Sequence, residues 1–383
     1  MQIPYILLIQ FLSFTVVMGS RTIFSLTALE FGATEFEVGT LAAANQAPAL
    51  LFSFAIGLMA DRFSARVLFL AGFACGALGI ALAAAHSTIP MFYVASALGG
   101  IWSAFLVVLI QRLVGLLSTR ESMTRNFSNQ AMMNSLSGIS GPIMAGYAIE
   151  HLGHAQAVGA LLPVLLLIGI LLVAGLRLLP GAPQRGTARA TDAAPLDRSL
   201  VRIMLISSAV QLAMELFPFY VTLHGHALGM SASAIGFAIS SSSVVSLTVR
   251  IILPRIVKRY GEERMLSSAL YVAAAAFALL PFSTSAGAMV AVALLLGIGM
   301  AFGGPLVLML VYKGVARERA GAAIGLRMTA NGATRVCVPP LFGALVGMTN
   351  LFGVALFTAV LVGASGWAIM RGDRASPGTG RRD

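Results

Sequence analysis

Long apolar stretches separated by short polar segments run along the whole chain. Each is close to the roughly 20 apolar residues that a helix needs to cross the hydrocarbon core of a bilayer. A segment surrounded by lipid must satisfy its own backbone hydrogen bonds, and a helix does so. The pattern therefore predicts an all-α membrane protein with twelve transmembrane helices. The expected spans are approximately 4–28, 37–60, 67–86, 89–111, 124–149, 155–178, 200–222, 232–254, 265–283, 286–311, 321–347 and 350–371.

The sequence also repeats itself at a constant offset of 197 residues. Asn134 recurs as Asn331 and Pro142 as Pro339, in one register with many further matches. A period this long is far beyond solenoid repeats of roughly 20–50 residues, so it indicates a duplicated half-protein. Because six spans are an even number, both halves enter the membrane in the same sense. This is the parallel type of internal repeat.

The repeat defines the expected domains. We expect a first six-helix bundle over residues 1–178 and a second over residues 200–371. The segment 179–199 between them is polar and rich in Pro, Gly and Ala, which is typical of a linker. The tail at 372–383 is expected to be disordered, as chain ends often are.

The net charge of +11 by itself would suggest a nucleic-acid partner. However, 58% of the residues are hydrophobic and only 10% are charged, whereas soluble domains carry about 25% charged residues. Lys and Arg fall in one set of alternating loops, and the other set has only Glu30, Glu35, Glu37, Glu150 and several His. This positive-inside pattern predicts that both termini and the linker are cytoplasmic. We therefore expect no nucleic-acid partner, but contact with lipid head groups.

The loop between spans 2 and 3 reads G-L-M-A-D-R-F-S-A-R and resembles the G-x-L-A-D-R-x-G-R-R motif of the major facilitator superfamily. The matching residues are Gly57, Asp61, Arg62 and Arg66, and the departures are Ser64 and Ala65. In the family, the equivalent Asp helps to hold the two halves together on the cytoplasmic side. Here it would face the positive N-terminal end of span 11, near 319–323. The alternative is a loop Asp that pairs with Arg62 or Arg66.

Span 5 contains a second motif, similar to the G-P-x-x-G-G type of the superfamily's antiporters. It consists of Gly138, Gly141, Pro142 and Gly146, with Ala145 in place of a glycine. These residues allow close helix contact and a bend, or serve packing alone. Together the motifs, the spans and the repeat indicate a drug- or metabolite-efflux-like member of the superfamily. The resemblance implies two bundles around a central cavity that alternates its access by rocking.

Charged side chains inside predicted spans are costly in lipid and usually face a cavity or a partner. Glu215 is the only acid well inside a span, roughly 20 Å above the start of span 7 at 1.5 Å per residue. Arg335 lies at a similar height, roughly 24 Å up span 11, and is the first candidate partner. Arg21 in span 1 competes for the same role, and Arg327 lies lower in span 11. Glu215 is either a protonatable coupling site or one half of a static ion pair.

Uncharged candidates complete the expected cavity. Asn134 and Asn331 are repeat mates and lie at equivalent depth, either lining the cavity or joining helices by hydrogen bonds. Trp102 in span 4 either contacts an apolar substrate or fills the core. Arg112 at the cytoplasmic end of span 4 is explained by snorkelling to the interface. The arginines favour an anionic or amphipathic solute.

These features predict a secondary active transporter of a small organic solute and exclude most other classes. There is no Walker loop, no catalytic motif and no cluster of ligands for a metal or cofactor, so we expect neither an enzyme nor a cofactor. The span 5 motif favours export, and protons are the candidate coupling ion. An importer, a uniporter and a non-transporting ligand sensor remain alternatives. The Arg-rich composition favours the inner (cell) membrane of a bacterium, and we expect a monomer.

Overall fold

The computed structural model describes residues 2–119, 121–179, 198–314 and 320–375, which form helices and no strand. The first half contains α1 (Gln2–Glu30), α2 (Glu35–Arg62), α3 (Ala65–Ala85), α4 (Ile89–Leu117), α5 (Met123–Leu152) and α6 (Leu162–Ala174). The second half contains α7 (Arg198–Ala227), α8 (Ala232–Tyr260), α9 (Glu262–Leu279), α10 (Ala286–Ala301), α11 (Gly303–Gly314), α12 (Ala320–Met348) and α13 (Leu351–Ala375). Three short 3₁₀ turns are η1 (Ala157–Leu161), η2 (Leu176–Leu178) and η3 (Leu280–Phe282).

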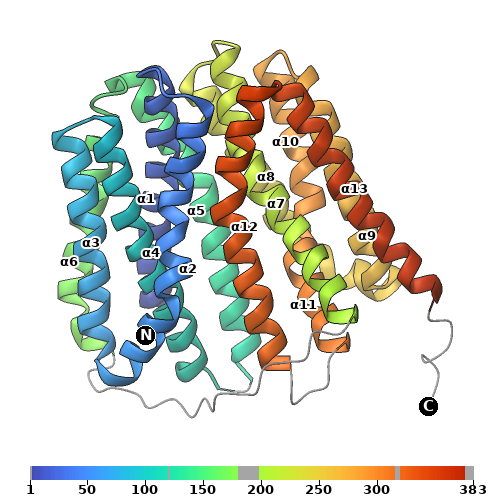
Figure 1. The fold of residues 1–383 in the computed structure, drawn as a ribbon. Helices are drawn as coiled ribbons and strands as arrows, with labels where there is room; N and C mark the ends of the chain where they lie inside the picture. Colours follow the sequence, from blue (N-terminus) through green and yellow to red (C-terminus); the bar gives the residue numbers. More distant parts are fainter. Residues whose placement is uncertain (1, 120, 180–197, 315–319, 376–383) are drawn as a thin grey trace.

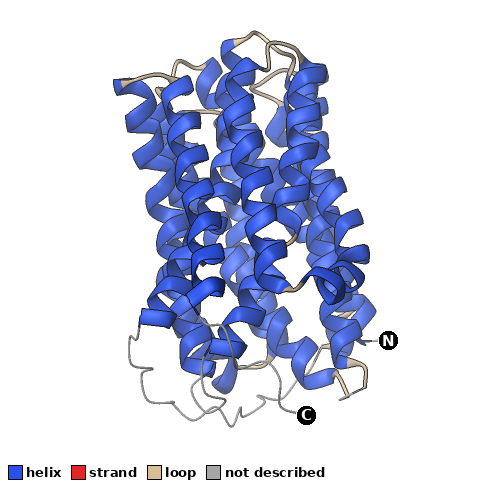
Figure 2. Cartoon of the chain, turned by 90° about the vertical axis from the view of Figure 1, so that its right-hand side faces the viewer, coloured by secondary structure: helices blue, strands red, loops and turns tan. Residues whose placement is uncertain are grey.

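The helices stand side by side as one bundle with the two halves next to each other (Figures 1 and 2). We call the end at which α1 begins and α13 ends the terminal end, which is the lower end in Figure 1, and the opposite end the distal end. Nine helices in the described part of the chain are long and apolar enough to cross a membrane. The prediction of an all-α membrane protein is therefore confirmed.

The count of twelve spans stays a prediction. Helices α5 and α12 are 30 and 29 residues long but are not among the nine apolar candidates. Both carry many polar side chains, such as Asn134 on α5 and Arg335 on α12, which line an internal cavity described below. Their polarity thus reflects what they face inside the protein. The interior of the protein replaces lipid along one side of each helix.

The expected single span at 286–311 is wrong in one respect, because the structure divides it into α10 and α11 at Phe302. Pro305 follows two glycines at this point. Proline has no N–H for an intrahelical hydrogen bond, and glycine is a poor helix former, so the sequence explains the break.

The predicted linker 179–199 lies almost entirely outside the described residues, since α7 begins at Arg198. Helix α13 runs to Ala375, so the first four residues of the expected disordered tail are helical. The remaining tail residues lie outside the part of the chain that the structure describes.

The helix bounds repeat at the offset seen in the sequence. Helix α2 begins at Glu35 and α8 at Ala232, 197 residues later. The N-caps repeat as well: Thr34 accepts a hydrogen bond from the Glu37 N–H, and Ser231 accepts one from the Ala234 N–H. Such caps satisfy backbone donors that a helix start leaves free. The duplicated sequence therefore specifies duplicated local structure.

The two halves meet most extensively where α2 packs on α12 and α5 packs on α8. Glycines make this contact close near the distal end. A Cβ atom at Gly39 would clash with the Pro339 carbonyl oxygen, and one at its repeat mate Gly236 would clash with the Pro142 carbonyl oxygen. Gly343 approaches the Glu35 carbonyl oxygen in the same way. Backbone-to-backbone contact of this kind needs a residue without a side chain, and small residues serve it in membrane helices.

Candidate functional site

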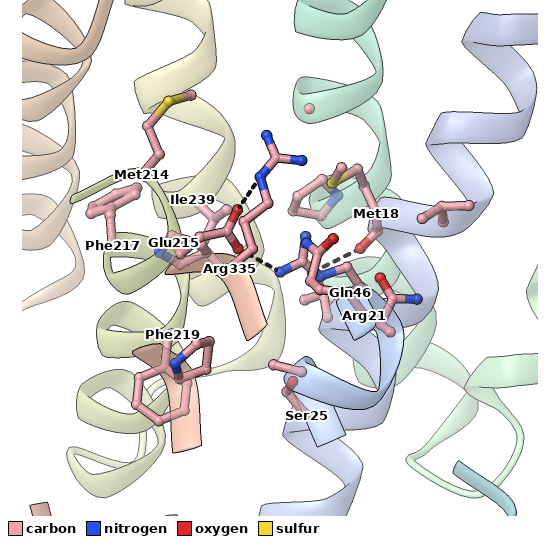
Figure 3. Close-up of a pocket in the computed structure, with 18 of the residues that line it drawn as sticks. Met18, Arg21, Ser25, Gln46, Met214, Glu215, Phe217, Phe219, Ile239 and Arg335 are labelled. Atoms are coloured by element: carbon pink, nitrogen blue, oxygen red, sulfur yellow. Dashed lines mark hydrogen bonds and ion pairs between the residues drawn. The ribbon is translucent and has the colours of Figure 1, made fainter. Parts of the chain in front are cut away.

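A cavity of about 390 Å³ lies between the two halves and is lined by residues of both (Figure 3). Its wall combines apolar side chains with hydroxyl, amide and charged groups from both halves. Val38 and Leu41 line it and are almost fully buried, at 1% and 2% exposure, close to the tight distal contacts of α2. A volume of several hundred cubic ångströms with a few polar groups is typical of a small-molecule site.

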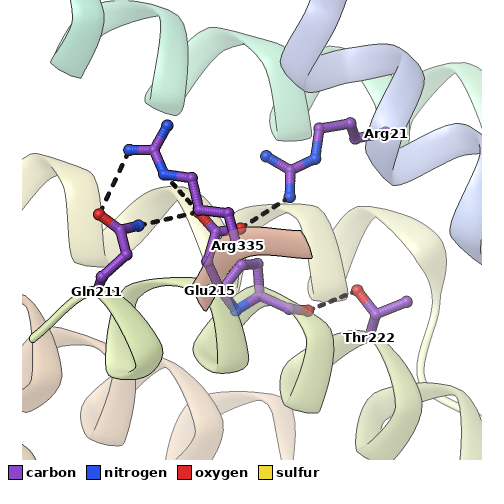
Figure 4. Close-up of polar contacts among 6 residues, drawn as sticks. Arg21, Gln211, Glu215, Thr222 and Arg335 are labelled. Carbon is purple, nitrogen blue, oxygen red and sulfur yellow. Dashed lines mark hydrogen bonds and ion pairs between the residues drawn. The ribbon is translucent and has the colours of Figure 1, made fainter. Parts of the chain in front are cut away.

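Three charged side chains meet in this cavity (Figure 4). An Nη2 atom of Arg21, on α1 in the first half, lies 3.2 Å from Glu215 Oε2 on α7 in the second half. The Nε atom of Arg335, on α12, lies 3.5 Å from Glu215 Oε1. Glu215 therefore pairs with both expected partners, and the shorter distance joins the two halves.

The amide of Gln211 completes this network. Its Nε2 donates to Glu215 Oε1 at 3.1 Å, and Arg335 Nη2 donates to its Oε1 at 3.4 Å. Gln211 and Glu215 are four residues apart on α7, so a helix brings them to one face. The Glu215 side chain is only 9% exposed, whereas that of Arg335 is 47% exposed. Two arginines and one glutamate leave one excess positive charge, and Arg335 presents it to the cavity.

Polar side chains of the first half lie across the cavity. Asn134 lines it, and Gln10 Nε2 donates to Asn134 Oδ1 at 2.6 Å. From the second half, α8 adds hydroxyl groups to the wall, those of Ser242, Ser243 and Ser246. Asn331, the repeat mate of Asn134, does not line the cavity and instead accepts a hydrogen bond from Ser207 at 3.0 Å.

Two candidates lie outside the cavity. Trp102 is 2% exposed and packs edge-to-face on Phe73, with ring centroids 6.0 Å apart. Close packing among α3 and α4 encloses the ring in the first-half core, which favours core filling over substrate contact, the two alternatives given for Trp102. Arg327 is partly buried nearer the terminal end, where its Nε donates to Ser207 Oγ at 2.8 Å.

The loop motif after α2 lies at the terminal end. Asp61 Oδ1 is 2.7 Å from Arg112 Nη1 of α4, an ion pair that the sequence patterns did not reveal. Arg66 donates to the Leu179 carbonyl oxygen at 2.9 Å, and Arg62 is exposed. The expected partner of Asp61, the start of span 11 near 319–323, lies partly outside the described residues. Gly57 has open space where a Cβ atom would lie.

The α5 motif provides close helix packing. A Cβ atom at Gly141 would lie 2.7 Å from Met18 Cβ and 2.9 Å from the Gly19 nitrogen on α1. One at Gly138 would lie 2.9 Å from Ser243 Oγ on α8, and Gly146 touches the Ala232 carbonyl oxygen. Pro142 stands inside α5 and lines the cavity together with Gly138. The motif thus joins α5 both to α1 and to the second half.

Titratable groups lie at the distal end, and one of them, Glu150, links the halves. Hydrogen bonds from Ser233, at the start of α8, lower the pKa of the Glu150 carboxyl at the end of α5. His154 lies in the loop before η1, with Nε2 3.8 Å from Glu30 Oε2. Burial lowers the pKa of the His154 imidazole, and the Glu30 charge opposes that shift.

Comparisons with known proteins agree with this architecture. A sequence profile of the Major Facilitator Superfamily matches residues 6–339 and, separately, 201–382. The chain therefore belongs to the major facilitator superfamily, and it is a transporter rather than an enzyme. The separate match of the second half agrees with a duplicated sequence. No curated protein sequence matches the chain significantly.

Solved transporter structures have the same fold. The nucleoside transporter NupG is 19% identical with a TM-score of 0.72, and the match covers 97% of this chain and 98% of that one. A POT family transporter in complex with a thioalcohol-conjugated peptide is 12% identical with a TM-score of 0.82, covering 97% and 96%. The POT family transporter PepTSo is 12% identical with a TM-score of 0.78, covering 98% of each chain. At these identities the likeness shows the fold alone.

Proposed function

We propose that this protein is a secondary active transporter that carries a small amphipathic organic anion together with a proton through the central cavity. The observation that carries the proposal is the position of Glu215 between Arg21 of the first half and Arg335 of the second. Its carboxylate occupies the arginine donors that a carboxylate of the solute would need. Planar guanidinium groups bind carboxylates with two parallel hydrogen bonds, so the two acids compete for the same donors.

This competition couples the solute to a proton. When a solute anion binds Arg335, the Glu215 carboxylate loses one of the two arginines that compensate its charge. This is costly because the Glu215 side chain is only 9% exposed. An unpaired buried carboxylate is costly, so protonation of Glu215 favours solute binding and solute binding favours protonation. Anion and proton then move together, and an inward proton gradient would drive uptake. The loss of the Arg21–Glu215 pair also removes a bond between the halves, which frees them to rock.

The size and lining of the cavity support a small solute with an apolar body. Phe14, Phe24, Phe217 and Phe219 line it beside the charged groups. Of the similar transporters named above, one is a nucleoside transporter and another is in complex with a conjugated peptide, so both act on or bind organic molecules. The hydroxyl groups of α8 would bind polar substituents of the solute.

Export in exchange for protons is the second candidate. It is favoured by the α5 motif, whose Gly141 and Gly146 make the close contacts described above. In an exchanger, proton and solute would bind in turn rather than together. The sign of the response to an imposed pH gradient separates the two candidates.

The test begins with identification of a solute. Thermal stabilisation of the purified protein by a panel of small carboxylic acids, each with its neutral amide as control, should select acids and be lost in Arg335→Gln. For a selected acid, proteoliposomes with an alkaline interior should accumulate it, and Glu215→Gln should lose accumulation while retaining exchange of labelled solute. Accumulation driven by the reverse gradient would establish export, and flux independent of either gradient would leave a uniporter. Absence of any flux in the wild type would refute transport of these acids.

A further inference from the structure

Two polar ladders face each other across α7 and α12. On α7, Ser207, Gln211 and Glu215 follow one another at intervals of four residues. On α12, Arg327, Asn331 and Arg335 do the same. Residues four apart lie on one face of a helix. The contacts join the ladders along their length: Arg327 and Asn331 with Ser207, and Arg335 with Gln211 and Glu215.

The upper part of this double ladder belongs to the cavity, but the lower part does not. Arg335 lines the cavity, whereas Arg327 lies eight residues earlier, about 12 Å nearer the terminal end at 1.5 Å per residue. Asn331 stands between them. Its repeat mate Asn134 lines the cavity from the first half, although Asn331 itself does not.

Arg327 carries a charge for which the described residues offer no acid partner. Its guanidinium donates to the Ser207 hydroxyl, a neutral acceptor, and no carboxylate within the described ranges lies within ion-pair distance of it. Ser207 itself is 2% exposed. A partly buried cation inside a membrane protein without an acid partner is costly, so such groups usually serve an ion or a substrate.

The first half shows that the fold does not need this charge. The repeat mate of Arg327 is Gln130, and that of Ser207 is Gln10. There Gln10 Nε2 donates to the Gln130 carbonyl oxygen at 3.3 Å and to Asn134 Oδ1 at 2.6 Å. The amide of Gln10 thus joins α1 to α5 at the equivalent place without any charged group, although its Oε1 has no hydrogen-bond partner among the described residues. The cation at 327 is an addition specific to the second half, where Glu215 and Arg335 also lie.

We propose that Arg327 is a second anion-binding subsite, between the central cavity and the terminal end, which binds the acidic group of the solute when it leaves or enters Arg335. This inference rests on the proposed function for the identity of the solute. The anionic group would pass from one guanidinium to the next along α12. On the opposite side, Asn134 of the first half, which accepts a hydrogen bond from Gln10, is neutral and would not compete for it.

The test measures the local charge directly and needs no known solute. In a background with Cys75 and Cys337 replaced by Ala, Asn331→Cys places a thiol one helical turn from Arg327. A sulfonate-bearing and a trimethylammonium-bearing thiosulfonate reagent are then compared by their rates of labelling. The labelling ratio is the rate with the anionic reagent divided by the rate with the cationic reagent. We expect this ratio to be about tenfold higher with Arg327 than in Arg327→Gln, because a nearby cation attracts the anionic reagent. Benzoate should slow this labelling only when residue 327 is cationic.

Matched variants keep the outcome clear. Arg327→Gln copies the residue that the first half has at this place, and Arg327→Lys should retain the anion preference. Arg335→Gln should remove carboxylate stabilisation at the central site, and in that variant the labelling at residue 331 should still depend on the charge at residue 327. The subsite is overturned, even if transport is observed, by either of two results. The labelling ratio does not change when residue 327 is changed, or neither reagent reaches the thiol at residue 331. Conversely, a preserved ratio in a protein without flux would reject the transport proposal and keep the anion site.

Discussion

Single residues determine how the halves are joined at the cavity. Glu215 compensates two arginines, and one of these, Arg21, belongs to the other half. We expect Glu215→Gln to lower the free energy of unfolding by about 1–3 kcal/mol, since two cations then lose their acid partner. Adding Arg21→Gln should recover part of this loss, because interacting sites are not additive. Thermal unfolding in detergent measures both, with the exposed loop acid change Glu121→Gln as control. If the losses of unfolding free energy in the two single variants simply add in the double variant, Arg21 and Glu215 are not energetically coupled.

The charged residues were predictable from sequence only in part. Counting the rise along spans 7 and 11 put Glu215 and Arg335 at one height, because helix geometry is fixed. It did not reveal that Arg21 lies closer to Glu215, since the mutual placement of α1 and α7 depends on how the halves pack. Gln211 between them looked like any polar residue of a span. Arg112 looked like an interfacial arginine, and only tertiary structure brings it to Asp61.

His154 gives the distal end a dependence on pH. Burial lowers the pKa of its imidazole below the ordinary value of about 6.5. Just below this pH, the unfolded chain therefore binds a proton at this imidazole that the folded protein does not bind. Stability from this group is therefore present above pH 6.5 or so and is lost as the pH falls below it. We expect the melting temperature to fall between pH 7.5 and pH 5.5, and to fall less in His154→Asn. An identical decline in the variant would show that other groups cause it.

At the scale of helices, glycines determine how closely the halves approach. On α12, a Cβ atom at Gly343 would meet the Glu35 carbonyl oxygen of α2, whereas one at Gly347 would meet nothing within 4 Å. The two positions are one helical turn apart and form a matched pair. We expect Gly343→Ala to destabilise the closed distal contact by about 1–3 kcal/mol, as overpacking does, and Gly347→Ala to be neutral. Reactivity of thiols placed at the distal end should rise only in the first variant.

The helices themselves were largely predictable, and the exceptions have clear causes. Apolar length predicted α1 to α4 and most of the second half, since crossing lipid constrains length and polarity alike. Helix α12 was placed within a residue or two by its expected span of 321–347, although it is too polar to be among the nine apolar candidates. The break between α10 and α11 was missed, because a glycine pair before a proline is also tolerated within membrane helices.

For the whole molecule, the duplication separates scaffold from chemistry. Gly39 and Gly236, with Pro339 and Pro142, make equivalent contacts on the two sides of the bundle. A hinge between two halves needs such equivalent surfaces on both sides. The charged site is not duplicated: the mates of Glu215 and Arg335 are Met18 and Gly138. Only one half needs to carry the groups that bind solute and proton, because both halves enclose one cavity.

This division predicts how the molecule moves. Spin labels at Leu152→Cys on α5 and Met348→Cys on α12, both exposed at the distal end, report the separation of the halves in the cysteine-free background. We expect one short distance in the wild type, because the distal contacts are closed. Glu215→Gln, which mimics the protonated acid and removes the Arg21 pair, should add a longer distance. Labels at Phe31→Cys and Leu152→Cys, within the first half, should not change. If both pairs respond alike, the halves deform rather than rock; if neither responds, the Arg21–Glu215 pair does not hold the distal end closed.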